Sequence, residues 1–448
     1  MNLTEPNPEG KESFGFIPQE YPGSDDPRFS HLTIESSVKV VSTRPRASFT
    51  MIKAYLGVGI LSLPFNFAKL GLGPSLLLFF IAGILNYAGM TSMLKVCDTI
   101  YEDSMDYPRV AKIVLGKSYR NFVEMNLIIL LMGSAMASTV FSMQFSSQIL
   151  CNLEMETLCN NHWYQYGFFL LIILGSATVT DLHYLSLPTS ISIVLQFIFL
   201  CAFVIKMISL IAVNGVYGGS FVDLLFKFDI KYLPIAIGAF VYAFEGIGCM
   251  LEVRNTLRDH QGYWKVLNLS YSIITAAYLL VGTLGALGLG DNITEIVFMS
   301  LPQTKFFLFV EASFIIGIIL GIQTNIFPAI RLIENWKIFR RVVADPETGR
   351  KSGFGRILIR YGVNLLCFAA AMWTPSFNLL IAFLGSINET VICFIMPALL
   401  FLARFPNLKN TLLGITNRVN MVLATIVGMI GSVLNFWTLI KYNSSEDL

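Results

Sequence analysis

Charged residues are scarce in this chain. They make up 13% of its 448 residues, whereas apolar residues make up 54%; a soluble domain carries roughly 25% charged residues. The net charge is only +2, without the positive excess that binding to nucleic acid requires. The composition therefore predicts a protein whose partner is the lipid bilayer, and it argues against a nucleic-acid partner.

Catalytic and metal-binding patterns are also missing. The four histidines are scattered, with neither an HExxH motif nor a Cys/His spacing that would suit a metal. The chain has no Walker lysine loop and no Gly-x-Ser-x-Gly motif. We therefore expect no enzymatic activity, no metal site, no cofactor and no direct use of ATP.

Long apolar runs occupy most of the chain after residue 46. A spanning helix needs about 20 such residues. The runs predict an all-α membrane protein with eleven spans: 48–71, 74–96, 122–150, 164–181, 186–212, 232–252, 265–289, 304–330, 355–374, 376–403 and 417–440. Residues 1–46 are polar and include six prolines, which predicts a disordered tail. Residues 47–440 form the predicted membrane domain, and residues 441–448 a short outer tail.

The placement of lysine and arginine predicts the orientation. With the N-terminal tail in the cytosol, 24 of the 31 lysines and arginines fall in cytosolic segments, as the positive-inside rule expects. Cys151 and Cys159 then share one outer loop, which is consistent with a disulfide or with two free thiols. The sequons at Asn292 and Asn443 also lie outside and are candidates for glycosylation.

The first span contains an unusual motif, Gly57-x-Gly59, followed by Pro64. These residues are poor choices for the interior of a helix in lipid, because unpaired backbone groups there cost several kcal/mol each. A break is tolerated only where the freed groups meet protein, water or a ligand. The motif therefore predicts an interrupted helix with a binding site at the break.

A second Gly-x-Gly, Gly246 to Gly248, lies in the sixth span directly after Glu245. The two motifs are five spans apart, and an odd offset reverses the direction of the chain. This predicts a 5+5 inverted repeat with its site at two broken helices. Repeat one covers about 48–212 and repeat two about 232–403, while helix eleven, about 417–440, lies outside the repeat.

The motifs around both glycine pairs resemble those of a known family. KAYLGVGILSLPF (Lys53–Phe65) resembles the first-helix signature of the amino acid/auxin permeases. FEGIG (Phe244–Gly248), with Leu251-Glu252-x-x-Asn255, is similar to the sixth-helix signature of their proton-coupled amino acid transporter branch. QTNIFPA (Gln323–Ala329) resembles that branch too.

The resemblance covers about residues 48–440, within the amino acid-polyamine-organocation superfamily. It implies an eleven-helix transporter of the leucine-transporter fold, with an amino-acid substrate and often proton coupling.

An amino acid is a zwitterion, so both of its charges must be met when it leaves water. Backbone N–H groups at the start of a half-helix suit the carboxylate, and carbonyls at the end of another suit the ammonium group. The predicted substrate-binding residues are Gly57, Val58, Gly59, Ile60, Ser138, Phe141, Ser142, Phe240, Tyr242, Phe244, Gly246, Gly248, Gln323 and Thr324. For the aromatic and serine residues among them, ordinary packing within the bundle is the alternative to substrate binding.

Two glutamates within spans are candidates for proton coupling. A carboxylate at the centre of a bilayer costs about 2.5–3.5 kcal/mol on insertion scales, so it should face protein or water. Glu245 lies at the second break and Glu389 in the tenth span. Glu245 has a structural alternative, as an ionised acceptor of hydrogen bonds from loose backbone N–H groups.

We expect secondary active transport by alternating access, with the proton as coupling ion, at the plasma membrane or a vacuolar or lysosomal membrane. One alternative is sodium coupling, which would need oxygen ligands between the first and eighth spans; Gln323 and Thr324 lie there, but a hydroxyl pair is not evident. The other alternative is an amino-acid sensor that has the same binding site.

Overall fold

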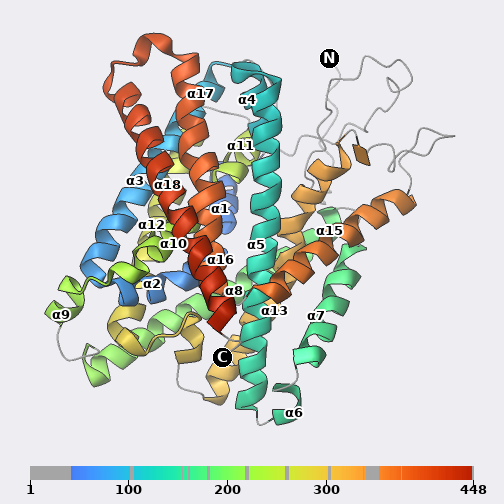
Figure 1. The fold of residues 1–448 in the computed structure, drawn as a ribbon, viewed down its shortest axis with the longest axis vertical. Helices are drawn as coiled ribbons and strands as arrows, with labels where there is room; N and C mark the ends of the chain where they lie inside the picture. The colour runs from blue at the N-terminus through green and yellow to red at the C-terminus, as the bar shows by residue number, and fades with distance from the viewer. Residues whose placement is uncertain are drawn as a thin grey trace, which may run out of the picture.

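The computed structural model describes residues 42–100, 105–153, 155–159, 162–178, 182–216, 221–257, 262–300, 304–336, 338–339, 353–374 and 376–445. Within these ranges the chain is nearly all helical (Figure 1). Residues 1–41 of the predicted tail lie outside the described part of the chain. The first helix begins at Arg44, where Pro45 suits the first helical turn.

The helical elements are α1 (Arg44–Tyr55), η2 (Val58–Ser62), α2 (Leu63–Leu70), α3 (Leu72–Asp98), α4 (Tyr107–Leu115), α5 (Lys117–Asn152), α6 (Glu156–Cys159), α7 (His162–Ala177), α8 (Leu182–Asn214), α9 (Phe221–Phe226), η3 (Ile230–Tyr232), α10 (Leu233–Ala243), α11 (Ile247–Thr256), α12 (Tyr263–Leu289), η5 (Gly290–Asn292), η6 (Val297–Ser300), α13 (Lys305–Glu334), α15 (Gly353–Trp373), α16 (Phe377–Leu384), η7 (Gly385–Ile395), α17 (Met396–Arg404), η8 (Pro406–Leu408) and α18 (Leu412–Ser445).

Nine helical stretches of the described chain are long and apolar enough to cross a membrane. The pair Arg44–Tyr55 and Val58–Leu70, bent by 49° at a short break, makes a tenth when it is taken as one span. Helix α7 corresponds to the fourth predicted span but has only 16 residues, fewer than the roughly 20 that a span needs. The structure thus confirms a helical membrane-spanning bundle, while the count of eleven stays a prediction.

The long helix α5 stands between two groups of helices in Figure 1. Helices α13, α15 and α7 lie to one side of it, and α3, α12 and α17 to the other. α13 packs along both α5 and α8. The two interrupted helices meet inside the bundle, because α1 contacts α11, α2 contacts α10, and α12 contacts both α1 and α2.

The helix after α16 is wound as a π-helix, η7, over 11 residues. It packs against α10 and α18, and two glycines make this approach close. A Cβ atom on Gly385 would lie 1.9 Å from the carbonyl oxygen of Gly238, and one on Gly238 would lie 2.1 Å from that of Ala382. Backbone therefore touches backbone where η7 and α16 meet α10.

We expect Gly385→Ala to destabilise the protein by about 1–3 kcal/mol, the usual cost of overpacking a core. The methyl group would have to displace a backbone carbonyl rather than a flexible side chain. Gly362→Ala in α15 is the control, because nothing lies within 4 Å of its Cβ position and alanine favours a helix. Thermal unfolding in detergent should give a lower Tm for the first variant and an unchanged or higher Tm for the second. Equal Tm values would contradict the close contact.

Candidate functional site

The first interruption lies between α1 and η2. The N–H of Gly57 donates to the carbonyl of Tyr55 over 2.7 Å, and this tight turn ends α1. The hydroxyl of Tyr278, on α12, donates to the same carbonyl over 2.6 Å. The next helix begins at Val58, so the N–H groups of Val58 and Gly59 are among those that a helix leaves without a partner in its own backbone.

The second interruption lies between α10, which ends at Ala243, and α11, which begins at Ile247. The N–H of Glu245 donates to the carbonyl of Tyr242 over 3.0 Å. The side-chain amide of Asn86, on α3, donates to the carbonyl of Phe244 over 3.2 Å. Both predicted breaks are therefore present, and in each a side chain from another helix bonds a freed carbonyl.

The two breaks touch through reciprocal tyrosine–glycine contacts. A Cβ atom on Gly59 would lie 3.3 Å from the ring of Tyr242 and 3.2 Å from the backbone of Ala243. A Cβ atom on Gly246 would lie 2.2 Å from the ring of Tyr55. Gly59 therefore makes room for Tyr242, near the end of α10, and Gly246 makes room for Tyr55, at the end of α1. The sequence alone does not indicate this role.

The other glycine of each pair is free of such contacts. Nothing lies within 4 Å of a Cβ position on Gly57, and Gly57 is exposed. Gly248 has only a methyl group of Leu127 near it, at 3.8 Å. Gly57 and Gly248 are thus the positions where a side chain can be added without disturbing the contact between the breaks.

The predicted polar residues of other spans are engaged within the scaffold. The hydroxyls of Ser138 and Ser142 donate to carbonyls one turn earlier in α5, over 2.9 and 2.7 Å. The amide of Gln323 donates to Asn364 of α15 over 2.8 Å, which turns it toward α15. Thr324 is half-buried on α13.

The predicted aromatic residues lie in the buried core. Phe141 packs against Phe314 and Phe377. Phe240 and Phe244 both contact Phe79 of α3. Phe141, Phe240 and Phe244 are at most 1% exposed, which is consistent with the packing alternative, and their part in substrate binding stays a prediction.

One face of α11 is exposed beyond the second break. Gly248, Cys249 and Glu252 follow one another at helical spacing on α11 and so share a face. Gly248 is half-buried, and Cys249 and Glu252 are exposed. Glu245, which precedes α11 in the break itself, is half-buried.

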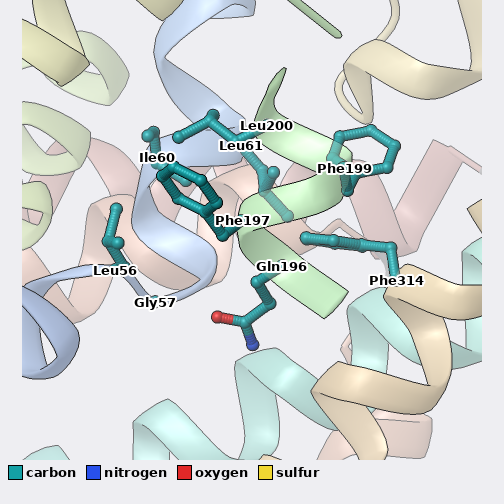
Figure 2. Close-up of a pocket in the computed structure, with 9 residues that line it drawn as sticks. All are labelled: Leu56, Gly57, Ile60, Leu61, Gln196, Phe197, Phe199, Leu200 and Phe314. Carbon is teal, nitrogen blue, oxygen red and sulfur yellow. The ribbon is translucent and has the colours of Figure 1, made fainter. Parts of the chain in front are cut away.

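An apolar pocket adjoins the first break on its other side (Figure 2). Its free space is about 20 Å³, roughly the room that one water molecule needs. Gln196 contributes a polar side chain to the lining, and the other side chains are apolar. The lining residues are Leu56, Gly57, Ile60 and Leu61 of the first span, Gln196, Phe197, Phe199 and Leu200 of α8, and Phe314 of α13.

Glu389 lies in the π-helix and is fully buried. The thiol of Cys393 donates to its Oε2 over 2.8 Å, and its Oε1 has no hydrogen-bond partner among the described residues. Glu389 also interacts electrostatically with Glu245. Cys393 also interacts with Asn86, whose amide donates to the carbonyl of Phe244, so polar groups lie between the π-helix and the second break.

Ion pairs and hydrogen bonds fasten the far ends of the broken helices. At the α11 end, Arg254 pairs with Asp98 over 2.8 Å. At the α2 end, Lys227 pairs with Asp291 and also donates to the carbonyl of Ala68 over 3.1 Å. Helices α11 and α2 are thus each tied to a neighbouring element outside the breaks.

The loop after η5 packs over the α2 end. Ile293, Ile296 and Val297 are at most 3% exposed. The hydroxyl of Ser376, which caps α16, donates to Glu295 over 2.6 Å. Burial raises the pKa of the Glu295 carboxyl, and the hydrogen bonds from Ser376 and the Asn378 backbone partly offset that rise.

The predicted modification sites are only partly visible. Cys151 takes part in a disulfide, but the side chain of Cys159 lies outside the described residues, so their pairing stays a prediction. Asn292 is exposed at the end of η5. The side chain of Asn443 is not among those described.

Two interrupted helices that touch at their breaks, inside a bundle of membrane-spanning helices, define a class of secondary-transporter folds. Comparison with known families agrees with this class. Residues 41–441 match the family described as transmembrane amino acid transporter protein, and the chain belongs to this family of transporters, which are not enzymes. The resemblance to the amino acid/auxin permeases is thereby confirmed.

Curated relatives share about a quarter of their residues with this chain. Vacuolar amino acid transporter 3 of Saccharomyces cerevisiae is 23% identical over 405 residues, which cover 89% of this chain and 56% of that protein. Amino acid transporter ANT1 of Arabidopsis thaliana is 25% identical over 398 residues, or 86% of this chain and 89% of that protein. The chain thus spans about half the length of the yeast relative.

A solved structure has the same fold. The crystal structure of MhsT in complex with L-phenylalanine matches with a TM-score of 0.56 at 12% sequence identity. The match covers 89% of this chain and 100% of the MhsT chain. At this identity the likeness shows the fold alone.

We expect Gly246→Ala to separate the two breaks and to lower stability by about 1–3 kcal/mol, because its methyl group would overlap the ring of Tyr55. Gly248→Ala in the same helix is the matched control and should leave the Tm unchanged. The double variant Tyr55→Ala/Gly246→Ala should lose less stability than the sum of the two single losses, since the clash disappears once the ring is removed. Equal effects of the two single substitutions, measured by thermal unfolding, would contradict the reciprocal contact.

Proposed function

We propose that this protein is a secondary active transporter that moves amino acids across a membrane by alternating access. The observation that carries the proposal is the direct contact of two interrupted helices, Gly59 against Ala243, at the start of η2 and the end of α10. Backbone donors of one break thereby lie beside backbone acceptors of the other. A zwitterion needs such a pair of opposite partial charges.

In this proposal the N–H groups of Val58 and Gly59 bind the substrate carboxylate, as helix N-termini bind anions. The last carbonyls of α10 bind the ammonium group. The printed names of the relatives support an amino-acid substrate, and MhsT has the same fold and was crystallised with L-phenylalanine.

We further propose eleven spans in a 5+5 inverted repeat plus one helix, with α7 belonging to the fourth span.

We propose that the described conformation is open on the side of α1 and α11. The face of α11 that carries Cys249 and Glu252 supports this, because both residues are exposed. The opposite side is filled by Phe141, Phe314 and Phe377 and by the buried loop after η5. With the N-terminal tail in the cytosol, as the distribution of positive charge predicts, this is an inward-facing state of a transporter in the vacuolar, lysosomal or plasma membrane.

We propose that protons drive the transport through Glu389 and Glu245. An ionised Glu389 would be costly, because it is fully buried, lies near a second carboxyl group and has only a thiol as hydrogen-bond partner. A proton removes this cost. Cys393 also interacts with Asn86, which donates to the carbonyl of Phe244, next to the proposed ammonium site. Protonation of Glu389 can therefore affect the substrate site through these contacts.

Purified protein in liposomes tests transport and coupling together. We expect uptake of labelled amino acid to rise at least tenfold with an inward proton gradient and not with a sodium gradient. Glu389→Gln should keep exchange of amino acid for amino acid but lose the response to the proton gradient, because the side chain can no longer gain or lose a proton.

Glu311→Gln is the matched control, since Glu311 is also a buried glutamate within a span, on α13. It should keep the proton response. A Glu389→Gln protein that still follows the proton gradient would rule out coupling through this residue. Binding of amino acids without any flux would instead favour the sensor.

A further inference from the structure

We propose that Glu295 takes up a proton from the outer solution when the loop of residues 293–297 closes, and that a chain of hydrogen bonds passes this closure to the first break. We call residues 293–297 the outer loop, because they lie opposite the cytosolic side that the distribution of positive charge predicts. The inference rests on the proposed alternating access. It adds a proton-binding residue outside the spans, apart from Glu389 and Glu245.

The outer loop is buried as one piece. Ile293, Ile296 and Val297 are at most 3% exposed. The hydroxyl of Thr294 donates to the carbonyl of Ile296 over 2.7 Å, which gives the loop a defined shape. Glu295 lies between these residues and is half-buried. Its carboxyl group must therefore lose water whenever the apolar side chains of the loop are covered.

The closed loop brings Glu295 to the start of α16. The hydroxyl of Ser376 donates to Oε2 of Glu295 over 2.6 Å, and the backbone N–H of Asn378 bonds the same carboxyl group. Ser376 also caps α16 by accepting from the N–H of Leu379 over 3.1 Å. A protonated carboxyl group can still accept hydrogen bonds, so Glu295 can take up a proton without losing this anchor.

Other titratable groups lie around the outer loop. Among the described residues they are Lys69, Lys227, Asp229, Tyr232 and Asp291. Both lysines are engaged with Asp291, Lys227 as an ion pair and Lys69 through the Asp291 carbonyl. Tyr232 interacts electrostatically with all three carboxylates, Glu295 included. The positive charge of this region is thus directed to Asp291, while Glu295 is bonded by neutral donors.

The direction of the pH effect follows from burial. Burial raises the pKa of Glu295 in the closed loop, and the hydrogen bonds from Ser376 and Asn378 offset only part of the rise. In an open loop the carboxyl group returns to water and to an ordinary pKa. The state with the higher pKa binds the proton more tightly, so a falling outer pH favours the closed loop.

A chain of hydrogen bonds continues from the outer loop to the first break. The side-chain amide of Asn66, on α2, donates to Oδ1 of Asn378 over 3.0 Å and to the carbonyl of Ser62 over 2.8 Å. The hydroxyl of Ser62 donates to the carbonyl of Gly59 over 2.9 Å. Ser62, Asn66 and Asn378 are at most 1% exposed. Asn378 thus binds Glu295 through its backbone and the first span through its side chain, so the closed loop stabilises the described position of the first break.

Closure can be measured by thiol labelling in proteoliposomes. A membrane-impermeant maleimide is added outside, and the labelling of the parent protein without the new cysteine is subtracted. Val297→Cys reports a side chain that is 1% exposed. Asn292→Cys, on an exposed residue of η5, corrects for the effect of pH on thiol reactivity. We expect the ratio of the two rates to rise with outer pH, by up to about tenfold per pH unit, the limit for one proton.

Two carboxylate substitutions test the role of Glu295. Glu295→Gln should keep the ratio low at every pH, because a neutral amide oxygen can still accept from Ser376. Asp223→Asn is the matched control, since Asp223 is an exposed carboxylate of α9, and it should respond as the wild type does. A Glu295→Gln protein that keeps the wild-type response overturns the inference. So does a wild-type ratio that stays constant or falls as outer pH rises.

The hydrogen-bond chain is tested with substrate. A mixture of amino acids without cysteine should slow the labelling of Val297→Cys. Asn66→Leu should abolish this protection and keep the response to pH. Ser62→Ala, which removes only the bond to Gly59, gives the same test if Asn66→Leu does not fold. Protection that survives the substitution rules out the chain. A mixture that neither protects nor is taken up contradicts the proposed function itself, whereas the pH response of the loop is read without substrate.

Discussion

The need to satisfy backbone polar groups inside a membrane governs this structure. Each interruption frees N–H and C=O groups that hydrocarbon cannot bond. Tyr278 meets the carbonyl of Tyr55, and Asn86 meets that of Phe244, so other helices supply part of the missing partners. The donors at the start of η2 are the ones that the proposal assigns to the substrate carboxylate. The scaffold thus explains why the breaks persist and why the proposed site lies there.

Close packing of backbone holds the two breaks together. Gly59 and Gly246 admit the rings of Tyr242 and Tyr55, while Gly238 and Gly385 let α10 touch the π-helix. The π-helix in turn carries Glu389 next to Cys393. A change in the charge of Glu389 would therefore act on the elements that position the second break, through contacts that leave little free space.

The sequence predicted the helical fold class and the two breaks well, because glycine pairs and apolar runs are local signals. It indicated less about what surrounds the breaks. Phe141, Phe240 and Phe244 are packed in the core and Gln323 bonds Asn364, arrangements that depend on other helices, and the part of these residues in substrate binding stays a prediction. Tyr55, Tyr278 and Asn86 gave no signal, since a tyrosine or asparagine in a span is as consistent with simple packing as with capping a distant carbonyl.

The sequence by itself determined that the chain forms long apolar helices and where two of them break, since hydrophobic length and glycine content act within one segment. Only the tertiary structure decided which glycine is open and which is filled, because Tyr242 and Ala243 of another helix lie against Gly59 and nothing lies against Gly57. It also decided that the space beside the break is lined by α8 and α13. These residues lie more than a hundred positions from the motif, and no spacing rule links them to it.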